Sequence, residues 1–443
     1  MRKWLVCLTI ATLFVGCKSD EQGVQVTDGQ LSFTWNADVC EQEIRLTNSG
    51  SWQVSSDANC RNWCYPVRSS GDEATITLWV SPNITDKPRS GKVTVISGGK
   101  SQEISVSQPA FTGNLDDYVY HLPVVFHVMY NDASNDTLNV KESQLKKILE
   151  GVNKLYAANK MNIVFEMAKY DKEGKKLKEP GIIRHEVKFK EYDPGKFLDH
   201  TNEEFSDYQL NLKKNINIYV FRFKQSSKES TTMGITTLPV VSKAHPLDSL
   251  LATDAANDYA YLNQSWGVCI NNAGIYEWQD NKSYNPRYVV ATMAHELGHY
   301  LGLLHTFSND ECNNDDACDD THISDYDNYM AYVAKLLDDI IASGRKDISM
   351  KEVATRIDCK TNEEFLADNI LDYTYTTNEK FTAQQRARTR HILKYAPLVP
   401  GPKLVDYNTT GKTMRAVSAP LDIKKITPCP KVPFRQLPVV GAK

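Results

Sequence analysis

The sequence predicts two folded parts, an all-β sandwich over residues 18–110 and an α+β domain over residues 118–396. Three observations support this division. The first part has short runs of alternating apolar residues between turn clusters, and almost no helical periodicity. The second part mixes similar strands with a strongly periodic helix. The total of 443 residues is enough for two or three domains, each with its own core.

Residues 1–17 have the pattern of an export signal. Two basic residues precede an apolar run from Trp4 to Val15, which is too short to span a bilayer and matches a secretory signal. The run is followed by Gly-Cys, and the closing Phe-Val-Gly-Cys resembles a bacterial lipobox, which implies cleavage before Cys17 and lipid on that residue. The alternative is an ordinary signal peptide with an incidental cysteine. We expect a cell-envelope lipoprotein held in the outer membrane through Cys17, and the next residues, Lys-Ser-Asp-Glu, resemble a surface-export tag.

The charge and the cysteine content narrow the class of protein further. The formal net charge of −4, with 24% charged residues, gives no basic bias that would indicate a nucleic-acid partner. Eight cysteines remain beyond the signal and the lipid site, and an even number in an exported chain predicts disulfides. Cys60 and Cys64 have the spacing of half a zinc site, but no second pair follows, which favours a disulfide or free thiols.

Residues 18–110 have the strand pattern of a sandwich. The runs ATITLWV, KVTV and EISVS place apolar residues at every second position, as half-buried strands require. Clusters of Gly, Pro, Ser, Asn and Asp separate the runs. Short strands at this spacing predict a sandwich of the immunoglobulin-like kind.

The same segment resembles the BACON domain in four short motifs, SWQV, SPN, RSG and VSQPA. That resemblance implies either binding of glycans or mucin, or a role as a spacer. Trp52, Trp63 and Trp79 could stack on a sugar, whereas tryptophans in a small sandwich more often belong to its core.

Residues 111–117 are a predicted linker, after which the pattern changes. HLPVVFHVMY is an apolar strand, and VKESQLKKILEGVNKLYAA repeats its apolar residues with the period of an amphipathic helix. Asn139 and Glu142 form a candidate capping box at the start of that helix. Further strands are predicted at NIVFEM, INIYVFRF and GVCINN. Strands and helices without strict alternation predict an α+β domain with a twisted mixed sheet.

The segment HELGHYLGLLH predicts a metal site on a helix over residues 286–301. Asn285 can cap this helix, and the proline after it is favoured at the first helical position. His295 and His299 are four residues apart, so both imidazoles lie on one face of the helix. They can reach one ion at about 2.0 to 2.1 Å, the usual zinc–nitrogen distance.

The rest of the segment predicts a catalytic site. Gly302 can adopt the left-handed conformation that ends a helix, so the chain can turn and bring His305 to the same ion. Three imidazole ligands leave zinc's fourth position to water, as in catalytic rather than structural sites. Glu296 can accept a proton from that water and later deliver it to the leaving amine.

HELGHYLGLLH follows the HExxHxxGxxH pattern of the metzincin zinc endopeptidases. The flanking motifs HLPVVFHVMYND, HTF, CDDTH, NILDYTY and KFTAQQRAR resemble the pappalysin-type branch, over residues 118–396. With the lipobox and the BACON-like part, the chain is similar to the zinc-dependent metalloproteinase lipoproteins of Bacteroidetes. The resemblance implies an endopeptidase that hydrolyses peptide bonds of extracellular proteins or glycoproteins, through a zinc-bound water activated by Glu296.

The chain departs from the family at the Met-turn, where Leu371 stands in place of the methionine. The resemblance implies that this side chain is an apolar floor below the metal, so a swap of similar volume should cost under about 1.5 kcal/mol. Tyr373 matches the family's tyrosine two residues on, whose hydroxyl could hydrogen-bond the oxyanion, a contribution of about 3 to 4 kcal/mol. Tyr375 is the competing candidate, and the sequence does not separate the two.

A second departure is an insertion before the Met-turn. YMAYVAKLLDDIIASG predicts a helix that ends at Gly344, and Ser349 with Glu352 forms a capping box for a second helix. This pair of helices could wall the primed side of the cleft, or be a packed surface elaboration.

The acidic loop NDECNNDDACDDTH is rich in the oxygen ligands that calcium prefers, and the resemblance implies calcium near it. The candidate ligands are Asp316, Asp319, Asp320 and Thr321. No EF-hand spacing is present, and the alternative is an acidic loop held by a disulfide of Cys312 or Cys318, with Cys359 as the candidate partner.

Two questions stay open at this level. Residues 397–443 are rich in Pro and Lys and could pack on the catalytic domain or, in a latent form, cover the cleft. The whole chain could also be a surface glycan- or protein-binding lipoprotein with an inactive zinc domain, or a peptidase that its sandwich tethers to mucin-like glycoproteins. The intact ligand set and Glu296 favour an active peptidase over a vestigial one.

Overall fold

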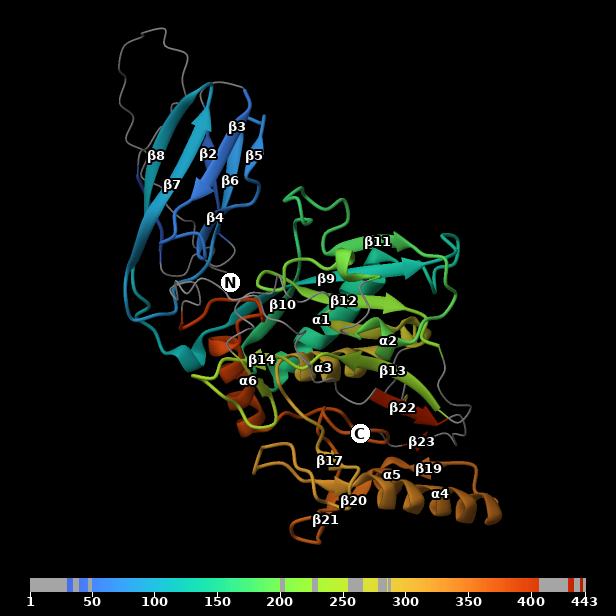
Figure 1. Cartoon of the computed structure of the whole chain (residues 1–443). Helices are drawn as coiled ribbons and strands as arrows, with labels where there is room; N and C mark the ends of the chain where they lie inside the picture. The colour runs from blue at the N-terminus through green and yellow to red at the C-terminus, as the bar shows by residue number, and fades with distance from the viewer. Residues whose placement is uncertain are drawn as a thin grey trace, which may run out of the picture.

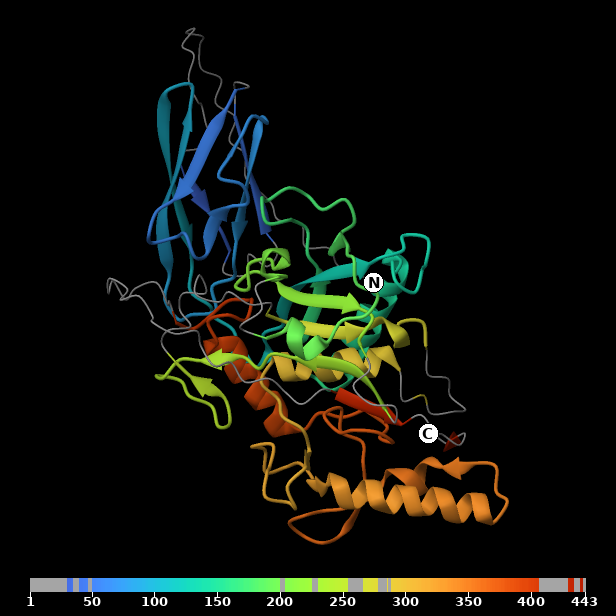
Figure 2. The ribbon, with the colours of Figure 1, turned by 45° about the vertical axis from the view of Figure 1, so that its right-hand side comes forward.

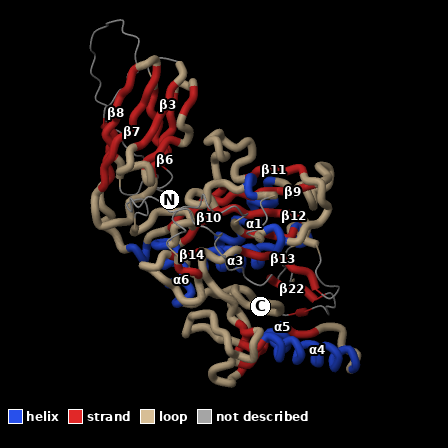
Figure 3. Tube along the Cα trace, viewed as in Figure 1, coloured by secondary structure: helices blue, strands red, loops and turns tan. Residues whose placement is uncertain are grey.

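The computed structural model describes residues 30–34, 40–46, 50–199, 204–224, 230–253, 266–277, 285, 288–405, 429–433 and 439–440. The predicted export signal and the lipid site at Cys17 lie outside these residues. Within them, no helix has the length and apolar character needed to cross a membrane. An all-strand part and a mixed part of strands and helices are visible in Figures 1 and 3.

The N-terminal part is a sandwich of two sheets. One sheet has the strand order β1-β8-β7-β3-β5 and the other has the order β2-β6-β4. The strands are β1 (Gln30–Ser32), β2 (Cys40–Arg45), β3 (Trp52–Ser56), β4 (Cys64–Pro66), β5 (Ser70–Gly71), β6 (Thr75–Val80), β7 (Arg89–Ser97) and β8 (Lys100–Gln108). The predicted alternation is confirmed, because the inward residues of β6, β7 and β8 form the buried core between the sheets.

Two of the three tryptophans considered for sugar stacking belong to that core. Trp52 is 4% exposed and Trp63 is 5% exposed, and their indole N–H groups donate to the carbonyl oxygens of Glu73 and Asn59. Cys60 and Cys64 are buried free thiols in the same core, which agrees with one of the two alternatives left by their spacing.

The sheet β2-β6-β4 faces the mixed part of the chain. The Lys169 ammonium lies 2.8 Å from a Glu41 carboxylate oxygen, and the Lys214 ammonium lies 3.8 Å from the centre of the Tyr65 ring. Trp79 pairs with both Glu41 and Tyr65 across the strands, so it stands on the same face of the sheet. The third tryptophan is therefore on the side of the sandwich that contacts the rest of the molecule.

The mixed part is built on a seven-stranded sheet of order β10-β9-β12-β16-β13-β22, with β11 also paired to β9. The strands are β9 (Tyr120–Tyr130), β10 (Ile163–Met167), β11 (Ile182–Glu186), β12 (Ile216–Phe221), β13 (Ser230–Thr236), β16 (Val268–Asn271) and β22 (Cys429–Pro433). β9, β10, β11, β12 and β16 run parallel, and β13 is antiparallel to both of its neighbours. The predicted α+β class with a mixed sheet is confirmed.

Helices α1 (Glu142–Ala158) and α3 (Val289–Tyr300) contact each other and the sheet. β12 is buried along its whole length because both of its faces are covered. Ile216, Ile218 and Val220 join the core with the two helices. Tyr219 and Phe221 join an aromatic cluster that includes Phe197 of α2 (Pro194–Phe197). One face of the sheet therefore packs against α3.

The start of each of these helices differs from the prediction. α1 begins at Glu142 without a side-chain cap, because the amide oxygen of Asn139 accepts a hydrogen bond from Arg184. The predicted Asn139–Glu142 capping box is therefore wrong. α3 begins at Val289, three residues later than predicted. Its N-cap residue is Tyr288, whose side chain makes no capping hydrogen bond.

The insertion forms the two predicted helices, α4 (Tyr326–Ala342) and α5 (Met350–Ala354). Gly344 has a φ of +76° after α4, and the Ser349–Glu352 capping box is present. A short hairpin follows, made of β20 (Thr355–Ile357) and β21 (Glu364–Leu366). Figure 2 shows α4 at the end of the molecule opposite the sandwich.

The C-terminal segment packs on the mixed part. After α6 (Ala383–Tyr395), Leu398 and Val399 are buried in the main core. Further along, β22 adds to the edge of β13, and β23 (Val439–Val440) pairs with β19 (Ile348–Ser349). The tail thus reaches both the edge of the sheet and the insertion.

Candidate metal centre

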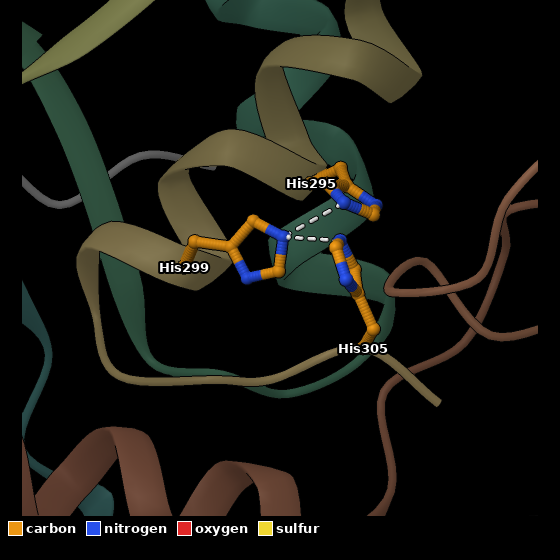
Figure 4. A group of neighbouring side chains, drawn as sticks. All are labelled: His295, His299 and His305. Carbon is orange, nitrogen blue, oxygen red and sulfur yellow. Dashed lines mark hydrogen bonds between the residues drawn. The ribbon is translucent and has the colours of Figure 1, made fainter. Parts of the chain in front are cut away.

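Three histidines converge at the C-terminal end of α3 (Figure 4). The Nε2 atom of His299 lies 2.9 Å from Nε2 of His295 and 3.0 Å from Nε2 of His305. Gly302 has a φ of +90° just after the helix, and a Cβ atom there would lie 2.7 Å from Ile392 Cγ1. Glycine therefore permits the turn that carries His305 back to the helix, as the sequence predicts.

Backbone carbonyls fix the orientation of two of the rings. The Nδ1–H of His295 donates to the carbonyl oxygen of Ile370 at 2.6 Å, and that of His299 donates to the carbonyl oxygen of Leu303 at 2.8 Å. Because a carbonyl can only accept, each Nδ1 carries the proton and each Nε2 presents a lone pair. Such outer hydrogen bonds are typical of metal-binding histidines.

The protonation states also fit a metal. Burial lowers the pKa of His295 to about 4 and holds the pKa values of His299 and His305 well below their usual range. Because His295 and His299 are neutral and protonated at Nδ1, no proton lies between their Nε2 atoms. These two lone pairs face one another at 2.9 Å and repel unless a cation lies between them, so the donor set fits zinc.

Glu296 lies beside the histidines on the same helix and is completely buried. Its Oε2 accepts a hydrogen bond from the Thr236 hydroxyl of β13, whereas Oε1 has no hydrogen-bond partner. A Cβ atom on Gly234 would lie 2.3 Å from Oε1, so the bare backbone of β13 makes room for the carboxylate. Burial raises the pKa of Glu296 to about 8, against the hydrogen bond from Thr236, which lowers it.

The structure distinguishes the two candidate tyrosines. The Tyr373 ring centre lies 4.5 Å from that of His305 and 5.9 Å from that of His295. Tyr375 belongs to the cluster that α4 and α5 form. Tyr373 is therefore the tyrosine beside the three histidines.

Leu371 lies in the floor of this site. It is fully buried in the main core, and a Cβ atom on Gly298 of α3 would lie 3.3 Å from Leu371 Cδ2. The backbone of the same turn accepts the His295 hydrogen bond at Ile370. A leucine thus occupies the apolar position below the active-site helix.

The comparisons with known proteins identify both parts of the chain. Residues 257–394 match the family model of the M43 peptidases, described as pregnancy-associated plasma protein-A, and residues 50–109 match the BACON model, described as a putative binding domain. The chain contains a pappalysin-type metzincin segment and a BACON domain. It is therefore a metalloprotease, a class that implies a bound metal, typically zinc.

Solved structures show weaker likeness to this metzincin. One is mature mirolysin from Tannerella forsythia in complex with a cleaved peptide, at 20% identity and a TM-score of 0.41, over 61% of this chain and 90% of that one. Another is a protein from Bacteroides thetaiotaomicron, at 20% identity and a TM-score of 0.17, over 22% of this chain and all of that one. None of the curated proteins matches the chain.

The predicted calcium site in the acidic loop of the metzincin stays a prediction. The buried Asp316 carboxylate accepts hydrogen bonds from the Thr321 hydroxyl and the Cys318 amide. Asp319 and Asp320 are exposed. The Asp319 backbone N–H donates to the Gln384 side chain, and the Asp320 carboxylate accepts the Gln384 backbone N–H. Over the part of the chain that the structure describes, the three histidines are the group of His, Cys, Asp or Glu side chains that converges. Of the four candidates, the structure joins Asp316 and Thr321 by a hydrogen bond, and Asp316 Oδ2 is buried without a hydrogen-bond partner.

The expected disulfide in this region is present. Cys312 pairs with Cys359, and Cys318 is a buried free thiol. Of the two alternatives for the partner of Cys359, the structure selects Cys312.

Three residues near the site have no signal in the sequence. Thr236 and Gly234 lie 60 or more positions from Glu296, and no motif marks them. Arg356, which holds the turn of Tyr373, comes from the insertion, where the family pattern gives no guidance. Long-range contacts such as these follow from the fold and not from local spacing.

We expect His299→Ala to lose the metal. Removal of a ligand should weaken zinc binding by more than the about 10- to 100-fold that outer partners contribute. Zinc per chain after dialysis, measured by mass spectrometry, tests this. His121→Ala, at a half-exposed histidine paired with Glu166, is the control; full zinc retention by His299→Ala would contradict the assignment.

We expect Leu371→Met to change the free energy of unfolding by less than about 1.5 kcal/mol, because the two side chains have similar volumes. Leu371→Ala should cost about 2 to 5 kcal/mol, because it leaves a cavity below α3. Urea unfolding of both variants measures the difference. An equal loss for methionine and alanine would show that the site requires the leucine shape.

Proposed function

We propose that the chain is a zinc-dependent endopeptidase in which Glu296 is the general base. The observation that supports this is the convergence of three imidazole Nε2 atoms next to a buried carboxylate. The vestigial alternative is less favoured, because the orientation of the rings and the placement of Glu296 are intact.

The chemistry follows from the residues. A zinc ion held by His295, His299 and His305 would polarise a peptide carbonyl and make a nearby water molecule more acidic. The free Oε1 of Glu296 can take the proton of the attacking water, and the carboxylic acid can then give that proton to the leaving amine. Burial raises the pKa of Glu296, and the positive charge of a bound zinc ion would favour its carboxylate form.

Tyr373 is the proposed donor to the oxyanion. Its ring lies against that of His305 and near that of His295. A hydroxyl that donates to the developing oxyanion stabilises the transition state more than the ground state.

We infer that the substrates are extracellular proteins or glycoproteins, and that the chain is anchored in the cell envelope through Cys17. The Cys312–Cys359 disulfide supports export, because such bonds persist in oxidising compartments. For the BACON domain we favour a spacer, because Trp52 and Trp63 are in its core and Trp79 stands on the face that contacts the peptidase. A tether to mucin-like glycoproteins would need residues other than these tryptophans.

Cleavage of a mixed peptide library by soluble residues 24–443, followed by mass spectrometry, tests the proposed function. Glu296→Gln should keep zinc and lose about 10²- to 10⁴-fold in kcat/KM, because the amide cannot accept the proton. A chelated sample is the second control. Undiminished cleavage by Glu296→Gln would refute the assigned base, and cleavage unaffected by the chelator would refute the metal.

We expect Tyr373→Phe to lower kcat by about 10²- to 10³-fold with zinc retained, because one oxyanion donor is lost. Tyr375→Phe is the matched control and should stay close to the parent. Steady-state kinetics on one library-derived peptide measures both. The reverse order of effects would move the oxyanion role to Tyr375.

A further inference from the structure

A buried arginine holds the turn that carries Tyr373. The Arg356 Nη2 group donates to the carbonyl oxygens of Tyr373 and Thr374, at 2.5 and 2.7 Å. Its Nη1 atom lies 2.8 Å from Asp372 Oδ1, and the two side chains are 0% and 2% exposed. The same Asp372 oxygen accepts the Tyr373 backbone N–H at 2.7 Å. The backbone of Tyr373 is thus fixed on both sides of its Cα atom.

The turn needs such support. Thr374 and Tyr375, which follow Tyr373, have φ values of +40° and +50°. Two consecutive residues with side chains in the left-handed region are strained, and such a turn persists only where the surroundings hold it. Arg356 binds the carbonyl groups that lead into both of these residues.

The arginine belongs to the insertion and is held there. It is the central residue of β20, opposite Phe365 of β21, and its guanidinium lies 3.9 Å from the centre of the Tyr329 ring of α4. A planar guanidinium can bind two carbonyls and a carboxylate while it stacks on a ring, which a lysine cannot do. The insertion therefore reaches the site through one side chain.

We propose that Arg356 is a positioning residue for Tyr373, so that the insertion is part of the catalytic apparatus rather than a surface elaboration. This rests on the oxyanion role proposed for Tyr373. Arg356 acts by keeping the Tyr373 ring against His305 and does not itself contact substrate.

A double-mutant cycle tests the proposal in the full chain. Arg356→Met should lower kcat at least tenfold, with KM within threefold and zinc content unchanged. In the Tyr373→Phe background the same change should lower kcat less than threefold, because the group that it positions is already absent. Arg356→Lys keeps the charge beside Asp372 and is the second variant in case Arg356→Met misfolds. Its kcat should lie between those of the parent and Arg356→Met. Arg345→Ala, at an exposed ion pair of the same insertion, is the control and should leave kcat unchanged.

The outcomes separate the two claims. Equal losses in both backgrounds, or no loss on Arg356→Met, would overturn the positioning role while Tyr373 keeps its own. No effect of Tyr373→Phe would instead remove the proposed oxyanion role on which the inference rests.

A second inference comes from the C-terminal strand. β22 pairs antiparallel with β13, with Gly234 opposite Cys429 and Thr232 opposite Lys431, and it also contacts α3. β13 is the strand whose Gly234 and Thr236 lie against Glu296. Without β22, the edge of β13 would be free and could pair with an extended peptide through backbone hydrogen bonds beside Glu296. We propose that β22 is an autoinhibitory strand in the place of a peptide substrate, which rests on the proposed peptidase activity.

Proline substitution in the full chain tests this inference. Val432→Pro removes a backbone N–H from β22 and should lower KM at least threefold, and a synthetic peptide of residues 427–435 should inhibit this variant competitively. Val439→Pro, the same change in β23, is the matched control because β23 pairs with β19. An unchanged KM, or no inhibition by the peptide, would overturn the inhibitory role. Absence of hydrolysis in every variant would count against the peptidase itself.

Discussion

The geometry of the site depends on two hydrogen bonds from imidazole Nδ1–H groups to backbone carbonyls. They commit His295 and His299 to one tautomer and direct both Nε2 lone pairs to the same point. One carbonyl belongs to the loop directly after α3, at Leu303, and the other to the distant turn at Ile370. The helix, its terminating turn and the segment before Tyr373 must therefore be folded together before the three nitrogens can meet.

The surroundings of the site make it dry. α3 is buried along its length, since β13, α1 and the turn of Leu371 cover it. Burial raises the pKa of the Glu296 carboxyl group and lowers the pKa values of the imidazoles, which therefore stay neutral. The same burial thus prepares one group to accept a proton and the others to donate lone pairs to a cation.

The sequence was most informative where function depends on local spacing. The i, i+4 histidines, the glycine turn before His305 and the helices of the insertion follow from periodicity and turn chemistry, and the structure contains them. Helix starts were less predictable, since Asn139 bonds to Arg184 in place of capping α1. The acidic loop has calcium-like composition, and the carboxylates of Asp316 and Asp320 accept hydrogen bonds within the protein. The contacts of Thr236 and Arg356 join segments far apart in the chain, so no local pattern could predict them.

The Cys312–Cys359 bond has a consequence for when the site becomes ordered. It spans 47 residues and encloses α4, α5 and β20, which together carry Arg356 to the turn of Tyr373. In the chain-entropy account, closing a loop of that length lowers the conformational entropy of the unfolded chain and so stabilises the folded state by about 4 kcal/mol. A reducing environment restores that freedom and loosens the segment. Oxidation of this one cysteine pair thus favours assembly of the tyrosine side of the site.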